Sequence, residues 1–211
     1  VNHQLSANSD IWQEHCEDIC LKLGVDIICK TVSIKNRGTG IEDAAREARY
    51  GIFEKLLKKN DLLILAHHAD DQIETMLFRL FRGSGIKGMS GMPISRLLGN
   101  GELFRPLLPF FRRDLESYAL ANQINWIEDD SNLDVAFDRN FIRHKLIPTI
   151  NERWPNSSFQ LNRSANIFAE SDFLINILAQ KDFAIVTEVS ERVGWSISID
   201  KLNGFETIRQ K

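Results

Sequence analysis

The sequence has few cysteines, no excess of positive charge and no long apolar run. Cys16, Cys20 and Cys29 are odd in number and form no CxxC pair, which argues against a disulfide framework and favours a reduced compartment. The formal net charge of −3 gives no overall basic field, so any contact with RNA would come from local patches. Without a signal peptide or a membrane-length apolar segment, we expect a cytoplasmic protein with no membrane partner.

The composition is that of an ordinary globular protein. Among 211 residues, 43% are hydrophobic and 26% are charged, which fits one large domain or one domain plus a fragment of another. The chain opens at Val1 rather than at Met and runs to Lys211 without a terminating signal. We therefore expect that both ends are cut from a longer protein.

The most informative stretch is residues 62–91. Residues 62–66 form an uninterrupted apolar run, which predicts a strand covered on both faces, as in a parallel sheet flanked by helices. A helix follows and should end at Gly83. Its apolar stripe comprises Ile73, Met76, Leu77, Leu80 and Phe81, and its opposite face comprises Asp71, Glu74, Thr75, Phe78 and Arg82.

An acidic cluster marks the point where this strand passes into the helix. His67, His68, Asp70 and Asp71 occur within five residues, and Glu74 follows one turn later. Carboxylates in a first helical turn can be plain caps that favour the helix dipole. Crowded carboxylates repel, however, and a metal, a cationic substrate or pKa tuning usually offsets that repulsion. Because ligands of open α/β sheets bind where strands end, we interpret the cluster as functional.

Strands and helices alternate along the first 150 residues. A strand tail at residues 1–5 precedes a helix that ends at Gly24, a strand at 25–34, a loop at 36–40 and a helix at 41–59. This order predicts an α/β fold with a parallel sheet flanked by helices. The stretch after Gly91 reads as irregular, and another helix is expected at 113–123. Cys16 and Cys20 could share a metal at helical spacing, but without a third ligand we expect them to be buried as small apolar residues.

The pattern of predicted secondary structure changes after Trp154. Residues 159–180 predict a long amphipathic helix, and 183–186 and 195–199 read as strands. We expect a domain boundary near residue 155. The first domain would span residues 1–155, and residues 156–211 would begin a second, mainly helical domain.

Four arginines outside the cluster have two readings each. Arg46 and Arg49 lie on one face of the 41–59 helix, where they are either solvated or directed at an anion. Arg139 and Arg143 open a later helix, where a cation opposes the helix dipole. They would therefore need nearby carboxylates such as Asp129, or an anionic ligand such as phosphate.

The motif HHADDQIETMLFRLFRGSG at residues 67–85 resembles the HxxDDxxET…RGxG signature of the tRNA(Ile)-lysidine synthetases, which are PP-loop ATP pyrophosphatases. Four further segments resemble elements of that family. They are GIEDAAREARY at 40–50, RPLL at 105–108, WIEDDSN at 126–132 and RNFIR at 139–143. The resemblance therefore extends over most of the chain, and implies a PP-loop fold followed by part of a helical tRNA-binding domain.

The resemblance implies a reaction in two steps. ATP adenylylates carbon 2 of the wobble cytidine in tRNA(Ile) with a CAU anticodon, and the ε-amine of free L-lysine then displaces AMP to leave lysidine. Lysine is a cation that attacks only as a neutral amine, so Asp71 and Glu74 are expected to hold its ammonium group and to help take its proton. Asp70 is expected to serve Mg²⁺.

The resemblance also assigns the remaining site residues. Arg143 is expected to be catalytic, and Arg139 to bind substrate. The residues expected to face the ATP are His67, Asp70, Arg82, Gly83, Arg46 and Arg49, with the two last open to phosphates of either ATP or tRNA.

Two other functions remain as alternatives. The first is a PP-loop tRNA thiolase, although those that act on cytidine depend on CxxC pairs, which this sequence does not contain. The second is a non-catalytic RNA-binding module, which predicts a conspicuous basic surface. The sequence leaves the oligomeric state open, and a homodimer is one of the arrangements that it allows.

Members of the family hold the pyrophosphate of ATP with an SGGxDS loop, and residues 1–211 contain no such segment. Backbone N–H groups and a helix N-terminus normally bind a triphosphate, and scattered arginines lack that preorganisation. We therefore predict that the 211-residue chain does not bind ATP tightly. Calorimetric titration with ATP and Mg²⁺ checks this, and micromolar binding would show that the phosphate site lies within these residues.

Overall fold

The computed structural model describes residues 1–32, 41–190 and 194–209, and the chain divides into two compact units. The first unit comprises residues 1–71 and 93–146, and the second comprises residues 72–92 and 147–211. Each unit therefore combines segments that are distant in the sequence. The predicted loop at 36–40 lies outside the described residues.

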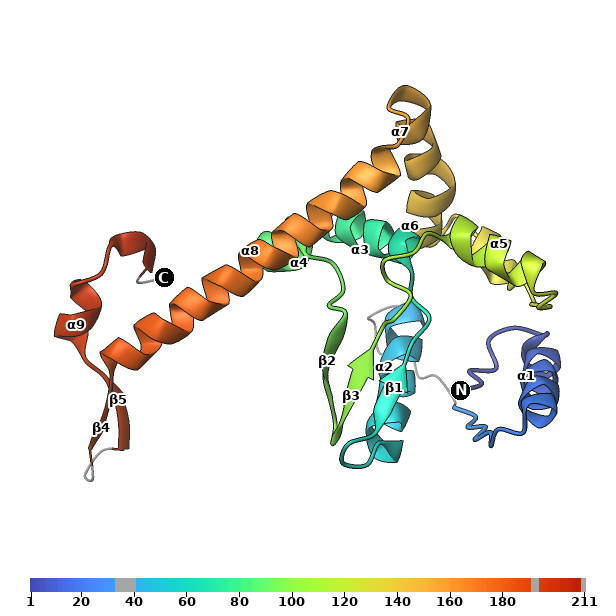
Figure 1. The fold of residues 1–211 in the computed structure, drawn as a ribbon, viewed down its shortest axis with the longest axis horizontal. Helices are drawn as coiled ribbons and strands as arrows, with labels where there is room; N and C mark the ends of the chain where they lie inside the picture. Colours follow the sequence, from blue (N-terminus) through green and yellow to red (C-terminus); the bar gives the residue numbers. More distant parts are fainter. Residues whose placement is uncertain (33–40, 191–193, 210–211) are drawn as a thin grey trace. The chain divides into compact units, whose positions relative to one another are not determined.

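A three-stranded sheet forms the centre of the first unit (Figure 1). Its order is β1 (Leu62–Ile64), β3 (Gly101–Phe104) and β2 (Ser95–Leu98). β1 and β3 are parallel, with Ile64 opposite Phe104, while β2 is antiparallel to β3. The parallel pair agrees with the predicted α/β class, but the expectation of an irregular stretch after Gly91 is wrong. The two-residue Gly99-Asn100 turn, with φ of 56° at the glycine, closes the hairpin of β2 and β3.

The middle strand of this sheet is β3, and its side chains are the best buried. Leu103 is fully buried and Leu98 of β2 nearly so, whereas Leu62 and Ile64 are 52% and 61% exposed. The prediction that residues 62–66 form a strand covered on both faces is therefore wrong for the part of the chain that the structure describes. An apolar run signals a strand, but which strand lies in the centre depends on tertiary pairing.

The helices of the first unit occur where the sequence placed them. α1 (Ser9–Leu23) ends at Gly24 in a left-handed conformation, φ 66°. α2 (Ile41–Leu56) buries Ala45, and α5 (Arg112–Ala121) follows the sheet. However, α1 has no buried residue and Cys16 is exposed, so the expected burial of its apolar side and cysteines is wrong.

The predicted strand at residues 25–34 is also wrong within its described part. Residues 25–32 make only an isolated parallel bridge, between Asn2 and Thr31, and residues 33 and 34 lie outside the description. The amide N–H of Asn2 donates to the carbonyl oxygen of Lys30 over 2.8 Å, and that of Val32 donates to the carbonyl oxygen of Asn2 over 2.9 Å. This ladder is too short to count as a strand.

Near its end the first unit contains α6 (Asp138–Phe141), followed by a π-helical turn at Ile142–Leu146. This turn carries Arg143 and His144, while Ile142 is buried. A π-helical turn inside a helical segment is uncommon and often marks a functional position.

The second unit contains most of α3 (Ala69–Phe81). Residues 72–77 are all buried, so the face expected to be polar is as buried as the apolar one, and Glu74 is only 1% exposed. Met76 packs with Met89 of α4 (Ile86–Met89) and with Ala165 of α8 (Ser157–Val186). This cluster is the core of the second unit.

Two side chains of α3 hold the loop at residues 88–92. The amide of Gln72 donates to the carbonyl oxygen of Met92 (3.0 Å) and accepts from its backbone N–H (2.6 Å). Arg79 donates to the carbonyl oxygens of Gly88 (3.2 Å) and Gly91 (2.6 Å). The loop is therefore tied to the helix by buried polar contacts.

The C-terminal part of the second unit follows α7 (Ile147–Arg153) and consists of α8, the β4 (Thr187–Ser190) and β5 (Gly194–Ile197) hairpin, α9 (Ile199–Asn203) and a short helical turn at Thr207–Arg209. Figure 1 shows α8 as a single long helix. The strand expected at residues 183–186 is wrong, because these residues form the last turn of α8. Asp182 in that turn pairs with Arg209. None of the described helices is both long and apolar enough to cross a membrane.

The loop contacts of Gln72 generate a prediction about Gly91. A Cβ at Gly91 would lie 2.6 Å from the Gln72 amide, and its φ is 66°; Gly83 has a similar φ of 75° but open space around it. We expect Gly83→Ala to lower the free energy of unfolding by about 1 kcal/mol through backbone strain alone. Gly91→Ala should cost about 2 kcal/mol more, because Gln72 is fixed by its hydrogen bonds. Urea denaturation of both variants measures the difference, and equal losses would mean that Gln72 moves aside freely.

Candidate functional site

The candidate site lies at the carboxyl edge of the parallel pair. Pairing continues past the strands, where the Leu65 N–H donates to the carbonyl oxygen of Phe104 over 2.9 Å. His67 follows β1 and Arg105 follows β3 directly, so the two side chains meet although 38 residues separate them. The carboxyl ends of parallel strands are where open α/β sheets bind ligands.

His67 is held as a neutral imidazole. The Nε of Arg105 lies 3.3 Å from Nδ1 of His67, and the imidazole is half-buried. Burial lowers the pKa of His67 to about 4; Asp71 opposes this shift, while Arg105, Arg46 and Arg139 add to it. These electrostatic contributions show that His67 lies among residues expected from the sequence to form the site.

Asp70 sits at the N-terminus of α5. Its Oδ2 accepts the backbone N–H of Arg112 over 2.7 Å and lies 3.4 Å from Nδ1 of His68. Burial alone would raise the pKa of Asp70, but the hydrogen bonds from His68 and from the Arg112 N–H outweigh it and lower the pKa below its ordinary value. The Asp70 carboxylate therefore stays ionised, and the positive end of the α5 helix dipole stabilises its negative charge.

Asp71 pairs with the arginine that the sequence marked as catalytic. Its Oδ1 lies 3.4 Å from Nη2 of Arg143, 72 residues away, and its Oδ2 accepts the backbone N–H of His68 over 3.0 Å. Both side chains keep some exposure, 17% for Asp71 and 27% for Arg143. A carboxylate thus lies beside Arg143, as one of its two readings requires, and the catalytic role of Arg143 remains a prediction.

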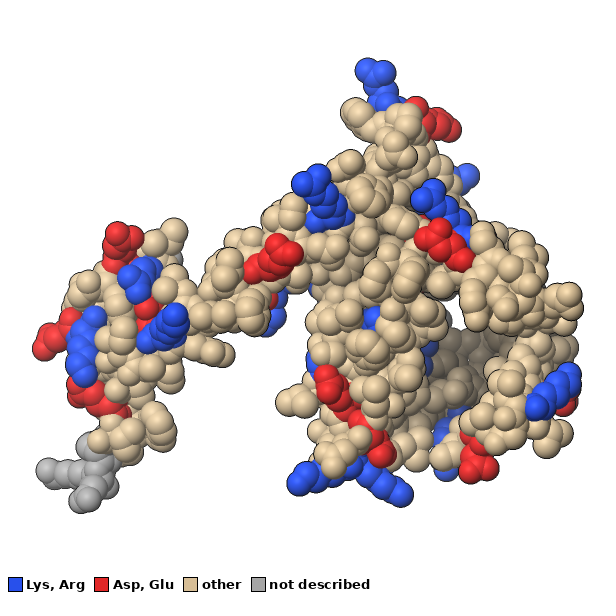
Figure 2. Space-filling model, viewed as in Figure 1, with Lys and Arg blue, Asp and Glu red and all other residues tan. Residues whose placement is uncertain are grey.

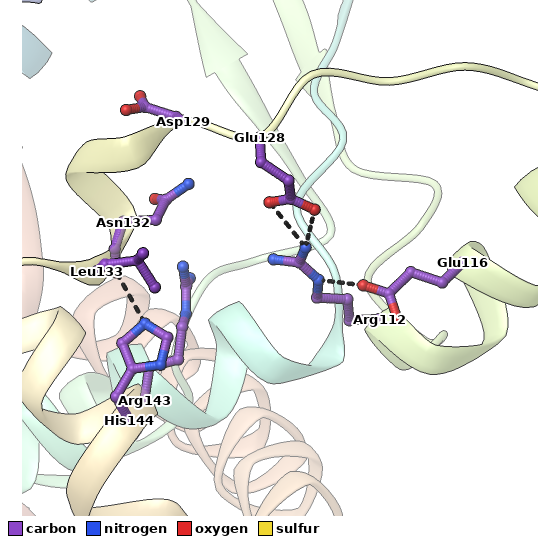
Figure 3. A pocket seen from close by; sticks show the side chains of 8 residues that line it. All are labelled: Arg112, Glu116, Glu128, Asp129, Asn132, Leu133, Arg143 and His144. Atoms are coloured by element: carbon purple, nitrogen blue, oxygen red, sulfur yellow. Dashed lines mark hydrogen bonds and ion pairs between the residues drawn. The ribbon is translucent and has the colours of Figure 1, made fainter.

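Arg143 also lines a cavity of about 460 Å³ that has an acidic wall (Figure 3). The Arg112 guanidinium lies between two carboxylates there, 2.6 Å from Oε1 of Glu116 and 3.0 Å from Oε1 of Glu128. The indole N–H of Trp126 also donates to Glu128, over 3.0 Å. With Asp129 on the same wall, the carboxylates outnumber the two arginines.

A second, larger cavity of about 920 Å³ opens between α1 and α2 (Figure 2), and its charged lining is mainly basic. Arg49, Arg139 and Arg143 line it, with Asp129 as the acidic residue. Its size is within the range of small-molecule sites. Arg143 and Asp129 line both cavities, so the two hollows meet beside the ion pair of Asp71.

The model of the PP-loop domain family matches residues 1–150, which cover both cavities and the acidic cluster. The chain belongs to the PP-loop family.

Curated relatives of this PP-loop chain carry the name tRNA(Ile)-lysidine synthase. The protein from Coxiella burnetii is 43% identical over 192 residues, which are 90% of this chain and 43% of the relative. That from Legionella pneumophila (strain Lens) is 40% identical over 206 residues, 98% of this chain and 47% of the relative. That from Pseudomonas fluorescens is 44% identical over 191 residues, which are 90% of this chain and 43% of the relative. The chain thus spans less than half the length of these relatives.

The other site residues predicted for this PP-loop chain fall in both units. Arg46 stacks on Tyr50 at 4.8 Å and donates to its hydroxyl, and Arg49 lines the larger cavity. Glu74, Arg82 and Gly83 belong to the second unit. There the Glu74 side chain is closed off from solvent, and the exposed Arg82 stacks on Phe78 at 4.9 Å. The predicted roles of these residues remain predictions.

The donors around Asp70 fit a magnesium ion bound with a nucleotide. Within the described ranges no group of three or more His, Cys, Asp and Glu side chains is arranged to hold a metal. Mg²⁺ commonly takes only one or two protein carboxylates and fills its shell with water and phosphate oxygens. Asp70 is ionised and 37% exposed, so it meets that requirement.

Sequence reasoning missed three contributors to this site. Arg105 lies within the RPLL segment, Arg112 supplies a backbone N–H to Asp70, and Glu128 holds the Arg112 side chain. Arg105 and Glu128 both lie in segments that resemble the family, RPLL and WIEDDSN, whereas Arg112 lies in none of the segments quoted for it. Had the strand at residues 101–104 been predicted as a parallel neighbour of β1, the residue after it would have been placed beside His67.

The lowered pKa of His67 predicts how the protein responds to acid. The pKa of His67 is about 4 in the folded state and near 6.5 in the unfolded state. Between pH 4 and 6.5 the unfolded state therefore binds a proton at His67 that the folded state does not bind. The stability contributed by the neutral form is complete above pH 6.5 and is lost as the pH falls toward 4. We expect the ring C–H resonance of His67, assigned by its absence in His67→Gln, to show no titration midpoint between pH 5.5 and 8. A midpoint near 6.5 would contradict this burial.

Proposed function

We propose that the protein ligates L-lysine to carbon 2 of the wobble cytidine in tRNA(Ile) with a CAU anticodon, at the expense of ATP, and so forms lysidine. The name of its relatives supports this reaction, and so does its PP-loop domain.

The observation that carries the proposal is the pair of cavities that share Arg143 and Asp129 in their lining, with Asp71 paired to Arg143. The reaction joins a cationic amino acid to a polyanionic RNA that ATP activates. A cavity with an acidic wall suits lysine, and a cavity lined by Arg49, Arg139 and Arg143 suits phosphates. Their shared edge is where the two substrates would meet.

In the second step the chain's own residues would hold lysine and receive its proton. The lysine ε-nitrogen forms a bond to carbon 2, the bond between carbon 2 and the AMP oxygen breaks, and AMP departs with that electron pair. The amine must lose protons during this step, and Asp71, the carboxylate paired with Arg143, would accept one of them. Arg143 beside it would stabilise the negative charge that develops on the departing phosphate.

ATP and the tRNA backbone would lie on the basic side. Arg46, Arg49 and Arg139 would face their phosphates, and Asp70 would share a Mg²⁺ ion with the phosphate oxygens. The magnesium ion would draw charge from the reacting phosphate. From the family motif we also expect Glu74 to bind the lysine ammonium group, and Arg82 and Gly83 to bind the nucleotide.

The alternatives receive less support. The relatives are named lysidine synthases rather than thiolases. A non-catalytic RNA-binding module predicts a conspicuous basic surface, whereas Lys and Arg are interspersed with Asp and Glu on the face drawn in Figure 2.

We also infer that the catalytic domain ends near residue 155 and that residues 156–211 begin a tRNA-binding domain. The PP-loop match, which stops at residue 150, supports this boundary. A tRNA substrate is consistent with a cytoplasmic location.

Mass spectrometry of tRNA(Ile) after incubation with the complete protein, ATP and lysine tests the proposed function. Wild-type protein should add the mass of a lysine residue to the anticodon fragment. Asp71→Asn should reduce this product by at least about 100-fold, because it removes the proton acceptor without changing volume. Asp18→Asn is the matched control, an exposed aspartate on α1, and should leave the yield unchanged. Near-normal yield from Asp71→Asn would remove Asp71 from the mechanism, and no product from wild type would refute the proposed function.

A further inference from the structure

Arg105 is a buried cation that has no carboxylate partner among the described residues. Its side chain is 2% exposed, and it donates from Nη1 to the carbonyl oxygen of Pro93 over 2.7 Å and from Nε to Nδ1 of His67 over 3.3 Å. The hydroxyl of Tyr50 is its remaining partner. Burial lowers the pKa of Arg105, and Tyr50 acts in the opposite direction. Burying a charge in this way is costly, which makes a purely space-filling role a poor explanation.

The contact between Arg105 and His67 defines a tautomer. A guanidinium has only N–H donors, so Nδ1 of His67 must offer a lone pair. A neutral imidazole with a free lone pair at Nδ1 carries its proton at Nε2. His67 is neutral over the physiological range, as its lowered pKa requires. The structure therefore contains an imidazole with a single, fixed N–H donor.

That donor lies within the candidate site and is not used by the protein. In the part of the chain that the structure describes, Nδ1 has Arg105 as its partner and Nε2 donates to no protein group. The charged groups that act on His67 are Asp71, Arg105, Arg46 and Arg139, three of them cationic. An anionic oxygen is the acceptor that such surroundings favour.

We propose that Arg105 is a positioning residue that fixes His67 as the neutral Nε2–H tautomer, so that His67 donates a hydrogen bond to a phosphate oxygen of the nucleotide substrate. The nucleotide part of this inference rests on the proposed function, and the tautomer part does not. A neutral donor adds no proton that the phosphate could take up, while the contact of Arg105 with Nδ1 leaves Nε2 as the donor. The RPLL segment would thus act in the reaction through Arg105, its first residue, which positions His67.

The tautomer is tested directly in the wild-type complete protein, labelled with ¹⁵N-histidine. Two-bond ¹⁵N–¹H correlation spectra distinguish a protonated from an unprotonated ring nitrogen. We expect His67 to show a protonated Nε2 and an unprotonated Nδ1, and addition of ATP and Mg²⁺ to shift the Nε2 resonance more than that of Nδ1. A proton on Nδ1, or a rapidly exchanging mixture, would overturn the proposal whether or not the protein makes lysidine.

A double-mutant cycle then tests whether Arg105 acts through His67. His67→Asn removes the Nε2 donor and should lower kcat/KM for ATP about 10- to 100-fold, as expected for a hydrogen bond to a charged group. His67→Gln, whose amide can reach the Nε2 position, should recover part of that loss. Arg105→Met should lower kcat/KM about 10-fold, and the double variant Arg105→Met/His67→Asn should be no worse than His67→Asn alone.

Arg96→Met is the matched control for Arg105→Met. Arg96 is exposed and stacks on the same Tyr50 ring at 5.3 Å, but it does not contact His67. It should change neither the tautomer nor kcat/KM. If the losses in kcat/KM of the two single variants multiplied in the double variant, the positioning role would be overturned. A change in KM for tRNA rather than for ATP would also overturn it. If Arg105→Met does not fold, as judged from its Tm, the wild-type spectrum still decides the tautomer. Wild-type protein that shows the expected tautomer but releases no AMP would refute the proposed function instead.

Discussion

The parallel pairing of β1 with β3 is the constraint on which the rest of the site depends. Two strands that run in the same direction end at the same edge, so whatever follows each of them must meet there. Here β1 leads into the histidines and the start of α3, and β3 leads into Arg105 and then α5. The N–H of Arg112 reaches Asp70 at this edge, so a single register places the acidic cluster against a second helix.

The charged side chains at this edge of the sheet are paired with opposite charges, but they differ in how tightly they are held. Asp71 is paired with Arg143 over a long 3.4 Å contact that leaves both partly exposed. Arg112 is held more tightly by two carboxylates, and they raise its pKa, Glu116 more than Glu128. Arg112 is therefore fixed in place, while Arg143 lines both cavities and Asp71 keeps 17% of its side chain exposed. An accessible pair is the one that can exchange partners when a charged substrate arrives.

Most elements of the fold could be predicted because their signals are local. The apolar run at β1, the 3.6-residue period of α3 and the glycine at the end of α1 each depend on neighbours within a few residues. The failures have a common cause. Residues 183–186 have strand-like composition but continue α8, and residues 25–32 have strand-like composition but make a single bridge. In both cases the outcome depends on pairing that composition does not encode: residues 25–31 are exposed and extend no ladder beyond their bridge to Asn2, while residues 183–186 continue the helical hydrogen bonding of α8.

The sequence by itself marked the residues that are expected to bear the chemistry. The two aspartates at the start of α3, the histidines before them and the arginines at 139 and 143 stand out by type and spacing, and spacing along a helix fixes which side chains share a face. Only the tertiary structure decided how they are paired. It brought Arg143 to Asp71 across 72 residues, and it buried Glu74 on a helix face that the pattern marked as polar. It also turned Arg105 from a residue of an unassigned segment into the partner of His67. Local sequence specifies local conformation, but contacts between distant segments depend on strand order and register, which no local pattern encodes.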